Sequence, residues 1–255
     1  MSFPPVRDAF RTILGVRFYI SDLEGLLERV PGGGLIVVPS APVMIRLEDD
    51  PAHREAMEGA DFAVTDSGFM VWLWLFRTGE RVRRISGLRL LRGLFARGDF
   101  KGPGETFWVM PTPADSEANL AWLRTQGFGV EAADSYIAPI YPKAGPVCDD
   151  ALISILSRRR PKLVAIALSG GVQERLGWAI RQRLDYKPAI LCIGGAIAFL
   201  SGQQDPIPVW ADRLAVGWVF RFASNPGPFA AKVRGVGRLP GMIWKYGPRS
   251  VAPGP

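Results

Sequence analysis

Short apolar runs alternate along this chain with longer segments whose apolar residues recur at helical spacing, and this alternation limits its fold most strongly. It is typical of a parallel sheet covered by helices. The sequence therefore predicts an α/β protein with a Rossmann-like parallel sheet flanked by helices and a basic C-terminal appendage. The predicted strands are residues 35–38, 62–65, 106–110, 163–168 and 190–193. The predicted helices are residues 21–29, 52–58, 68–77, 87–97, 114–125, 148–157, 172–184 and 196–202, and the proline-containing residues 136–147 are predicted to form a loop.

A carboxylate follows the second predicted strand directly. Asp66 stands between that strand and the helix predicted to begin at Gly68, and Arg84-Ile85-Ser86-Gly87 follows about twenty residues later. Ligands of open α/β sheets bind outside the carboxyl ends of the strands. Asp66 is therefore a candidate base near an anionic substrate, with Arg84 close behind. The alternative is that Asp66 caps the helix that begins at Gly68.

Two glycine pairs follow other predicted strands. Gly170-Gly171 comes after the strand at 163–168, and Gly194-Gly195 comes after the strand at 190–193. Glycine lets the backbone approach a ligand, and a helix N-terminus offers free N–H groups to phosphate. Neither pair completes a dinucleotide fingerprint or a P-loop, and no ribose-binding acid follows a full fingerprint, which disfavours a nicotinamide-dependent oxidoreductase. The two turns favour a nucleotide or sugar-phosphate ligand, whereas the alternative is that each glycine only permits a tight turn.

Two polar residues follow the first glycine pair. Gln173 and Glu174 stand in the first turn of the helix predicted over 172–184. One hypothesis directs Gln173 to hydroxyl or carbonyl groups of a ligand. The alternative is that both residues simply favour a helix start.

The composition excludes several classes of site. The formal charge of +7 and the pI near 9.8 indicate an acidic partner such as phosphate, nucleic acid or an anionic membrane. Cys148 and Cys192 are far apart, which argues against a disulfide framework or a zinc site. His53, the one histidine, stands in a polar helix start and is predicted to be solvated, so a histidine triad is not expected. No segment reaches the roughly 20 apolar residues of a membrane-spanning helix, and a cytoplasmic location is expected.

The chain changes character after Gly202. We predict an α/β catalytic domain over residues 1–202 and a basic, aromatic appendage over residues 203–255. Interleaved aromatic and cationic side chains favour a membrane interface, ahead of a basic helix packed on the domain. No recognisable motif supports a nucleic-acid partner. The appendage cations include Arg213, Arg221, Arg234 and Arg238.

Several motifs share their order and spacing with one family. Over roughly residues 35 to 235 the chain resembles the WecG/TagA/CpsF family of bacterial glycosyltransferases (glycosyltransferase family 26). The similar segments are Thr65-Asp66-Ser67-Gly68, Arg84-Ile85-Ser86-Gly87, Ser169-Gly170-Gly171-Val172-Gln173-Glu174, the run from Gly194 to Phe199-Leu200-Ser201-Gly202, Pro208-x-Trp210, Trp218-x-x-Arg221 and Pro226.

The resemblance implies transfer of a sugar, typically an N-acetylhexosamine, from a UDP-linked donor to a polyprenyl-diphosphate-linked saccharide, and our hypothesis is that the transfer inverts the anomeric configuration. It implies cell-surface or exopolysaccharide synthesis at the inner face of the cytoplasmic membrane, with Asp66 as base, Arg84 beside the donor and Gln173 lining the pocket. Glu174 and Ser40 are carried over as substrate-binding residues. The appendage is implied to bind the membrane and the lipid diphosphate. Since the sequence has no Asp-x-Asp motif, no metal or other cofactor is expected. Self-association stays open, because the apolar residues 69–76 fit either the core or a contact with a neighbouring copy.

The chain departs from the family at several polar positions. The family's Thr-x-Asn is Val38-Pro39-Ser40 here, and an aspartate of its later motif is Ala198. A site that hydrogen-bonds a sugar loses specificity when such partners are replaced. The departures favour a different sugar and acceptor. The alternative is a non-catalytic nucleotide-sugar-binding or scaffold subunit of a polysaccharide assembly complex.

Overall fold

One sheet of eight strands organises the described part of the chain. The computed structural model describes residues 9–204, 227 and 234–251. The strands lie in the order β1-β2-β4-β3-β8-β7-β5-β6, and every pair is parallel except the antiparallel hairpin of β1 and β2. Their bounds are β1 (Phe10–Ile13), β2 (Val16–Tyr19), β3 (Gly34–Val37), β4 (Phe62–Val64), β5 (Thr106–Met110), β6 (Ser135–Ile137), β7 (Leu163–Ile166) and β8 (Ala189–Cys192).

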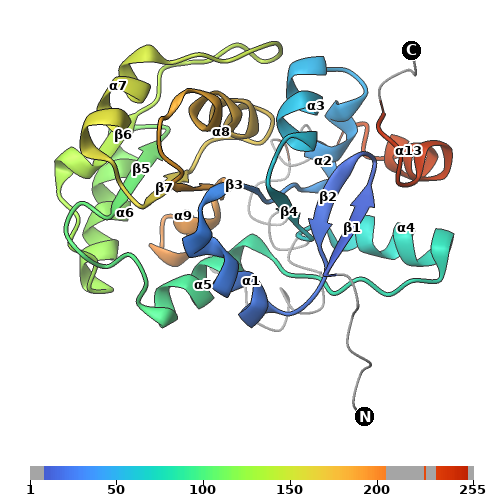
Figure 1. Cartoon of the computed structure of the whole chain (residues 1–255), viewed down its shortest axis with the longest axis horizontal. Coiled ribbons are helices and arrows are strands. Elements are labelled where there is room, and N and C mark those ends of the chain that lie inside the picture. Colours follow the sequence, from blue (N-terminus) through green and yellow to red (C-terminus); the bar gives the residue numbers. More distant parts are fainter. Residues whose placement is uncertain (1–8, 205–226, 228–233, 252–255) are drawn as a thin grey trace.

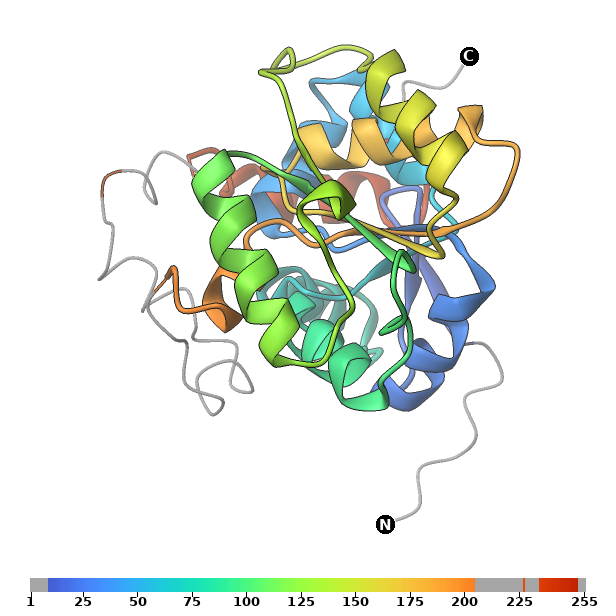
Figure 2. The same ribbon diagram turned by 90° about the vertical axis from the view of Figure 1, so that its left-hand side faces the viewer.

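Helices cover both faces of this sheet (Figures 1 and 2). The α-helices are α1 (Leu23–Arg29), α2 (Ala41–Met44), α3 (Pro51–Glu58), α4 (Gly68–Thr78), α5 (Gly87–Arg97), α6 (Pro113–Thr125), α7 (Asp150–Arg159), α8 (Val172–Arg183), α9 (Ala196–Leu200) and α13 (Arg238–Tyr246). Three short 3₁₀ turns are η1 (Val30–Gly32), η2 (Ile45–Leu47) and η3 (Ala132–Asp134). The predicted α/β class with a Rossmann-like sheet is confirmed.

The side chains of the central strands separate into two apolar layers. Along β5, Phe107 and Val109 join one cluster while Trp108 and Met110 join the other, as the two-residue period of a strand requires. The first cluster packs under α3, α4, α7, α8 and α13, and the second packs under α1, α5, α6 and α9. Strands buried on both faces are apolar at nearly every position, which explains why β3, β5, β7 and β8 were visible as apolar runs.

The five predicted strands are five of the six inner strands, namely β4, β3, β8, β7 and β5. The prediction missed the β1–β2 hairpin and β6. Strand β6 includes the first residues of the loop predicted at 136–147. Both β1 and β6 are edge strands with partly exposed residues. Their short mixed sequences carry neither a continuous apolar run nor a clear alternation, so their pairing depends on the neighbouring strand.

Part of the predicted appendage packs against the α/β body. Leu239, Met242 and Ile243 of α13 are buried in the same cluster as Met70 and Trp74 of α4. The backbone N–H of Leu14 donates to the carbonyl of Gly247 at 2.8 Å, which ties the end of α13 to the β1–β2 turn. Residues 205–226 and 228–233 lie outside the described residues, so the boundary at 202 stays a prediction. Within the described ranges, no helix combines the length and apolarity needed to cross a bilayer.

The prediction for His53 was wrong, because this side chain is completely buried. It lies in the first turn of α3, where Asp50 caps the helix by accepting from the N–H groups of Ala52 and His53. Its Nε2 lies 3.1 Å from the carbonyl oxygen of Val43, so Nε2 carries the proton. Nδ1 is buried and has no hydrogen-bond partner among the described residues. Burial lowers the pKa of His53, with opposing effects from nearby Glu174 and Asp50.

His53 should make the fold less stable as the pH falls from 7 toward 5. Its folded-state pKa lies below the unfolded value near 6.5, so the unfolded chain binds the proton first. The stabilisation is fully present above the unfolded pKa and decreases below it, by at most about 1.4 kcal/mol per pH unit. Urea unfolding at several pH values measures this slope. The variant His53→Gln keeps a donor for the carbonyl of Val43, and its free energy of unfolding should depend less on pH, since the chain has no second histidine. Equal pH dependence in the two proteins would show that His53 does not cause the loss of stability.

Candidate functional site

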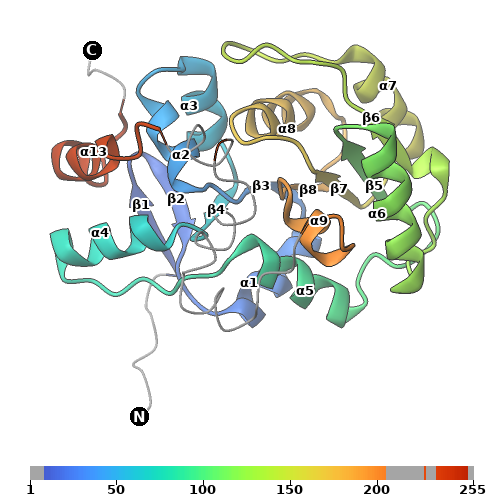
Figure 3. The ribbon, with the colours of Figure 1, turned by 180° about the vertical axis from the view of Figure 1, so that it is seen from behind.

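The carboxyl ends of four adjacent central strands collect the residues singled out in the sequence. Asp66 follows β4 and Ser40 follows β3, while the two glycine pairs follow β7 and β8. These four strands are neighbours in the order β4-β3-β8-β7, and all run parallel. The first four strands of the chain form one half of the sheet and the last four form the other half, and β3 and β8 pair where the halves meet. The predicted residues therefore lie where ligands bind in open α/β sheets (Figure 3).

Asp66 does not cap α4, because Ser67 does so: its Oγ accepts from the N–H of Met70 at 3.2 Å. The Oδ1 of Asp66 instead accepts from the N–H of Gly87 at 3.1 Å, at the first residue of α5. Its carboxylate is partly exposed and lies at a helix N-terminus, which favours the negative charge. The fold thus joins the two segments that the sequence separated by about twenty residues.

Arg84 is held beside Asp66 by main-chain contacts. Its Nε donates to the carbonyl oxygen of Asp66 at 2.7 Å. The buried Thr65 supports the segment from below: its Oγ1 donates to the carbonyl of Arg83 at 2.7 Å and accepts from the N–H of Ile85 at 3.3 Å. Thr65 was missed as a positioning residue, although a hydroxyl residue at the end of an apolar strand was a visible signal.

Gln173 and Glu174 connect the two glycine turns through a buried chain of hydrogen bonds. The N–H of Gly171 donates to Glu174 Oε2 at 2.5 Å, and Gln173 Nε2 donates to Glu174 Oε1 at 3.0 Å. Gln173 Oε1 then accepts from the N–H of Gly194 at 2.7 Å. Gln173 is 3% exposed and Glu174 is completely buried. Both side chains therefore set the positions of the turns after β7 and β8, and two of the four candidate glycine N–H groups are used within the chain.

A buried arginine supports the same turn from the other side. Arg175 Nε donates to the carbonyl of Gly171 at 2.6 Å, and its guanidinium also donates to the carbonyls of Pro142 and Gly145. The carboxylate oxygen Oδ2 of Asp50 lies 3.7 Å from Arg175 Nε and forms an ion pair with it. Burial lowers the pKa of Arg175. The guanidinium thereby fixes the loop after β6 to the start of α8, a contact between distant segments that the sequence did not suggest.

Arg46 adds an exposed cation at the same edge. Its guanidinium lies against Gly171, where a Cβ atom would stand 2.2 Å from one of its nitrogens. Gly171 also has φ +92°, a backbone conformation that favours glycine. Sequence reasoning missed Arg46, although a lone cation within the apolar segment from residue 41 to residue 47 was a signal.

Two positions that depart from the resembled family, Val38 and Ser40, follow β3 at this edge. Ser40 is partly exposed at the N-terminal end of α2, and its side chain makes no capping hydrogen bond. A Cβ on Gly87 would contact Val38 Cγ1 at 3.1 Å and Ala196 Cβ at 4.0 Å. Val38 therefore packs directly against the start of α5, next to Asp66. Ala198 is buried in α9.

The structure describes two of the four appendage arginines, since Arg213 and Arg221 lie outside the described residues. Arg234 is exposed. Arg238 is bound by two carboxylates, with Nη1 2.8 Å from Asp49 and Nη2 2.5 Å from Glu48. The hydrogen bond from Arg238 lowers the pKa of Asp49, and the two acids raise the pKa of Arg238. Arg238 therefore attaches α13 to the segment after η2.

Comparison with known proteins gives one family. The family model described as "Glycosyl transferase WecG/TagA/CpsF family" matches residues 11–248. The match is longer than the resemblance over residues 35–235, and it includes the β1–β2 hairpin and α13. It also covers every residue placed at the carboxyl edge of the sheet.

Proposed function

Because the chain belongs to the WecG/TagA/CpsF family of glycosyltransferases, we propose that it moves a sugar from a UDP-sugar to a polyprenyl-diphosphate-linked saccharide. The sugar is an N-acetylhexosamine or a close relative, and the product serves cell-surface or exopolysaccharide synthesis. One observation carries the proposal: the carboxylate of Asp66 lies at the carboxyl edge of the sheet, and Arg84 Nε donates a hydrogen bond to the backbone carbonyl of Asp66. In this proposal Asp66 is the base and Arg84 is the cation beside the bound nucleotide-sugar.

The proposed reaction is a single displacement. Asp66 accepts the proton of the acceptor hydroxyl, whose oxygen attacks the anomeric carbon on the face opposite the leaving group. The bond between that carbon and the diphosphate oxygen breaks, and UDP leaves with the electron pair, so the configuration inverts. Arg84 and the exposed guanidinium of Arg46 stabilise the developing negative charge. In this proposal no metal ion or other cofactor takes part.

Gln173 and Glu174 act in this proposal as positioning residues. Their buried hydrogen bonds hold Gly171 and Gly194 in place. The two turns then present Gly170 and Gly195 to the donor phosphate. Ser40, partly exposed after β3, remains available to the sugar or the acceptor.

Incubation of the purified protein with a panel of UDP-sugars, with and without a polyprenyl-diphosphate saccharide, tests the function through release of UDP. Acceptor-dependent release by one donor is the expected result. The scaffold alternative draws support from Val38, which occupies space beside Gly87 where the resembled family has a hydroxyl. That alternative predicts donor binding without release over the whole acceptor panel.

The appendage is proposed to bind the anionic inner face of the cytoplasmic membrane and the lipid diphosphate. Replacing Arg221 and Arg234 with glutamate should weaken flotation with anionic liposomes. Added salt should have the same effect, because attraction between surface charges is screened over about 10 Å at 0.1 M salt. Arg238→Glu serves as a contrast, since it also breaks ion pairs with Glu48 and Asp49 and should lower the melting temperature. Unchanged flotation of the double variant would remove these arginines from membrane binding.

A further inference from the structure

Helix α4 directs three large aromatic side chains to solvent. Phe69, Trp72 and Phe76 are 45%, 56% and 71% exposed, and their spacing of three and four residues puts them on one face. Met70 and Trp74 point the opposite way and are buried. The rings of Trp72 and Phe76 stack with centroids 6.0 Å apart. We call Phe69, Trp72 and Phe76 the α4 aromatic face; such exposed clusters mark interaction surfaces.

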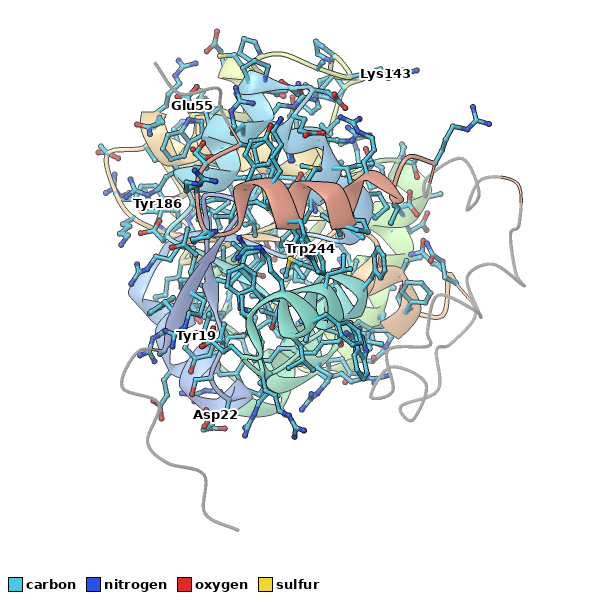
Figure 4. All side chains as sticks on the ribbon, turned by 90° about the vertical axis from the view of Figure 1, so that its right-hand side faces the viewer. Tyr19, Asp22, Glu55, Lys143, Tyr186 and Trp244 are labelled. Carbon is cyan, nitrogen blue, oxygen red and sulfur yellow. The ribbon has the colours of Figure 1, made fainter. Side chains whose placement is uncertain are left out.

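A second helix extends this surface. Helix α13 packs against α4, and the two lie side by side on one side of the molecule (Figure 4). Trp244 of α13 is 52% exposed and lies on this side. Two helices that pack together, from segments about 170 residues apart in sequence, thus each expose a tryptophan ring.

Cationic side chains line a groove at the C-terminal end of helix α4. A groove of about 570 Å³ lies between β1, β2 and α4, and Arg11, Arg17 and Arg77 line it. The Arg77 guanidinium lies against Gly247, where a Cβ would stand 2.7 Å from one of its nitrogens. The carboxylate of Glu80 accepts hydrogen bonds from Arg11 Nε at 2.6 Å and from the indole N–H of Trp74 at 3.2 Å. Helix α4 itself contains no acidic residue.

The charges decide between two occupants of this surface. A second copy in a two-fold contact would bury the same patch on both sides, so its arginines would enter the contact while helix α4 offers no acid to pair with them. An anionic lipid surface instead matches both features. Tryptophan rings favour the headgroup level of a bilayer, and arginines near the surface attract anionic lipid.

We propose that the α4 aromatic face, together with Trp244 and the groove of Arg11, Arg17 and Arg77, docks on an anionic lipid surface. This inference deepens the proposed function and rests on it for the lipid-linked acceptor. Helix α4 begins two residues after Asp66, so a bilayer along its outer face passes beside the candidate base. Docking here would hold the carboxyl edge of the sheet where a lipid-linked saccharide is presented.

Vesicle flotation of the full chain tests the proposal. The probes are vesicles of equal parts phosphatidylglycerol and phosphatidylcholine, and vesicles of phosphatidylcholine alone. The variant Trp72→Ser with Phe76→Ser should lose about tenfold or more of its partition into the mixed vesicles. The matched control is Ile140→Ser, a fully exposed apolar residue after β6, which should partition as the wild type does. Arg77→Gln should weaken binding to the mixed vesicles more than to phosphatidylcholine.

Unchanged partition of the double variant would overturn the proposal. Light scattering without lipid provides a second arm: if the double variant only dissociates a dimer, the face is a contact between copies and the proposal fails. UDP release with a short-chain, water-soluble acceptor separates this inference from the proposed function, because the double variant should retain it. If the wild type floats with vesicles and the double variant does not, but the wild type releases no UDP, the proposed function is refuted and the docking surface is supported.

Discussion

Replacing Asp66 with asparagine should reduce turnover by about 10²–10⁴-fold, the contribution of a positioned general base. Asparagine keeps an oxygen that accepts from the N–H of Gly87, so the start of α5 should stay in place. The loss then reports the missing base, not a displaced helix. The measurement is the initial rate of acceptor-dependent UDP release at saturating donor and acceptor.

Circular dichroism and the melting temperature of Asp66→Asn should match the wild type. The control variant is Asp185→Asn, an exposed aspartate that pairs with Arg160 away from the carboxyl edge. It should keep its full rate. An Asp66→Asn protein that retains most of its turnover would show that another group takes the proton.

Replacing Glu174 with alanine should lower the free energy of unfolding by about 3 kcal/mol. The change leaves the N–H of Gly171 and the amide of Gln173 without an acceptor, and each buried unsatisfied group costs roughly 1–3 kcal/mol. Arg175 and His53 also lie in the electrostatic field of this carboxylate. Urea unfolding followed by tryptophan fluorescence measures the change.

The matched control is Glu117→Ala, an exposed position on α6 that should change the free energy of unfolding by at most about 0.5 kcal/mol. If Glu174 only positions the glycine turns, the Glu174→Ala protein that remains folded should bind UDP-sugar more weakly through misplacement of Gly194. A loss of stability below about 1 kcal/mol would show that the buried network contributes little.

The inner half of the sheet and its helices were predictable because their signals are local. Strands buried on both faces must be apolar along their whole length, and helix α5 was predicted with its observed bounds because Ser86 caps it and Gly98 ends it. The candidate base was predictable for a similar reason, since parallel strands bring their carboxyl ends to one edge. The β1–β2 hairpin and β6 lacked such signals, because their short sequences mix polar and apolar residues and β1 and β6 are edge strands.

The roles of the polar residues were less predictable. Glu174 was expected to bind substrate, yet its carboxylate is buried against Gly171 and Gln173. His53 was expected in solvent because its own segment is polar, and it is buried because α3 packs against α8. Arg238 was expected at the membrane or the lipid diphosphate, and it binds Glu48 and Asp49, almost 190 residues away. A polar side chain can satisfy its hydrogen bonds with any segment that the fold brings near, and one sequence does not reveal which.

The sequence by itself determined the α/β class, five adjacent strands at the centre of the sheet and the edge where Asp66 and the glycine turns gather. It did so because apolar patterning is a property of each segment alone, and because helical crossovers between successive strands make those strands parallel. Only the tertiary structure decided that Arg84 lies on Asp66, that Gln173 and Glu174 connect two turns, and that α4 buries Met70 and Trp74 but exposes Phe69, Trp72 and Phe76. Residues 68–76 are apolar on every side, so the pattern of the helix cannot choose its inner face. The contacts with α13 and the sheet make that choice.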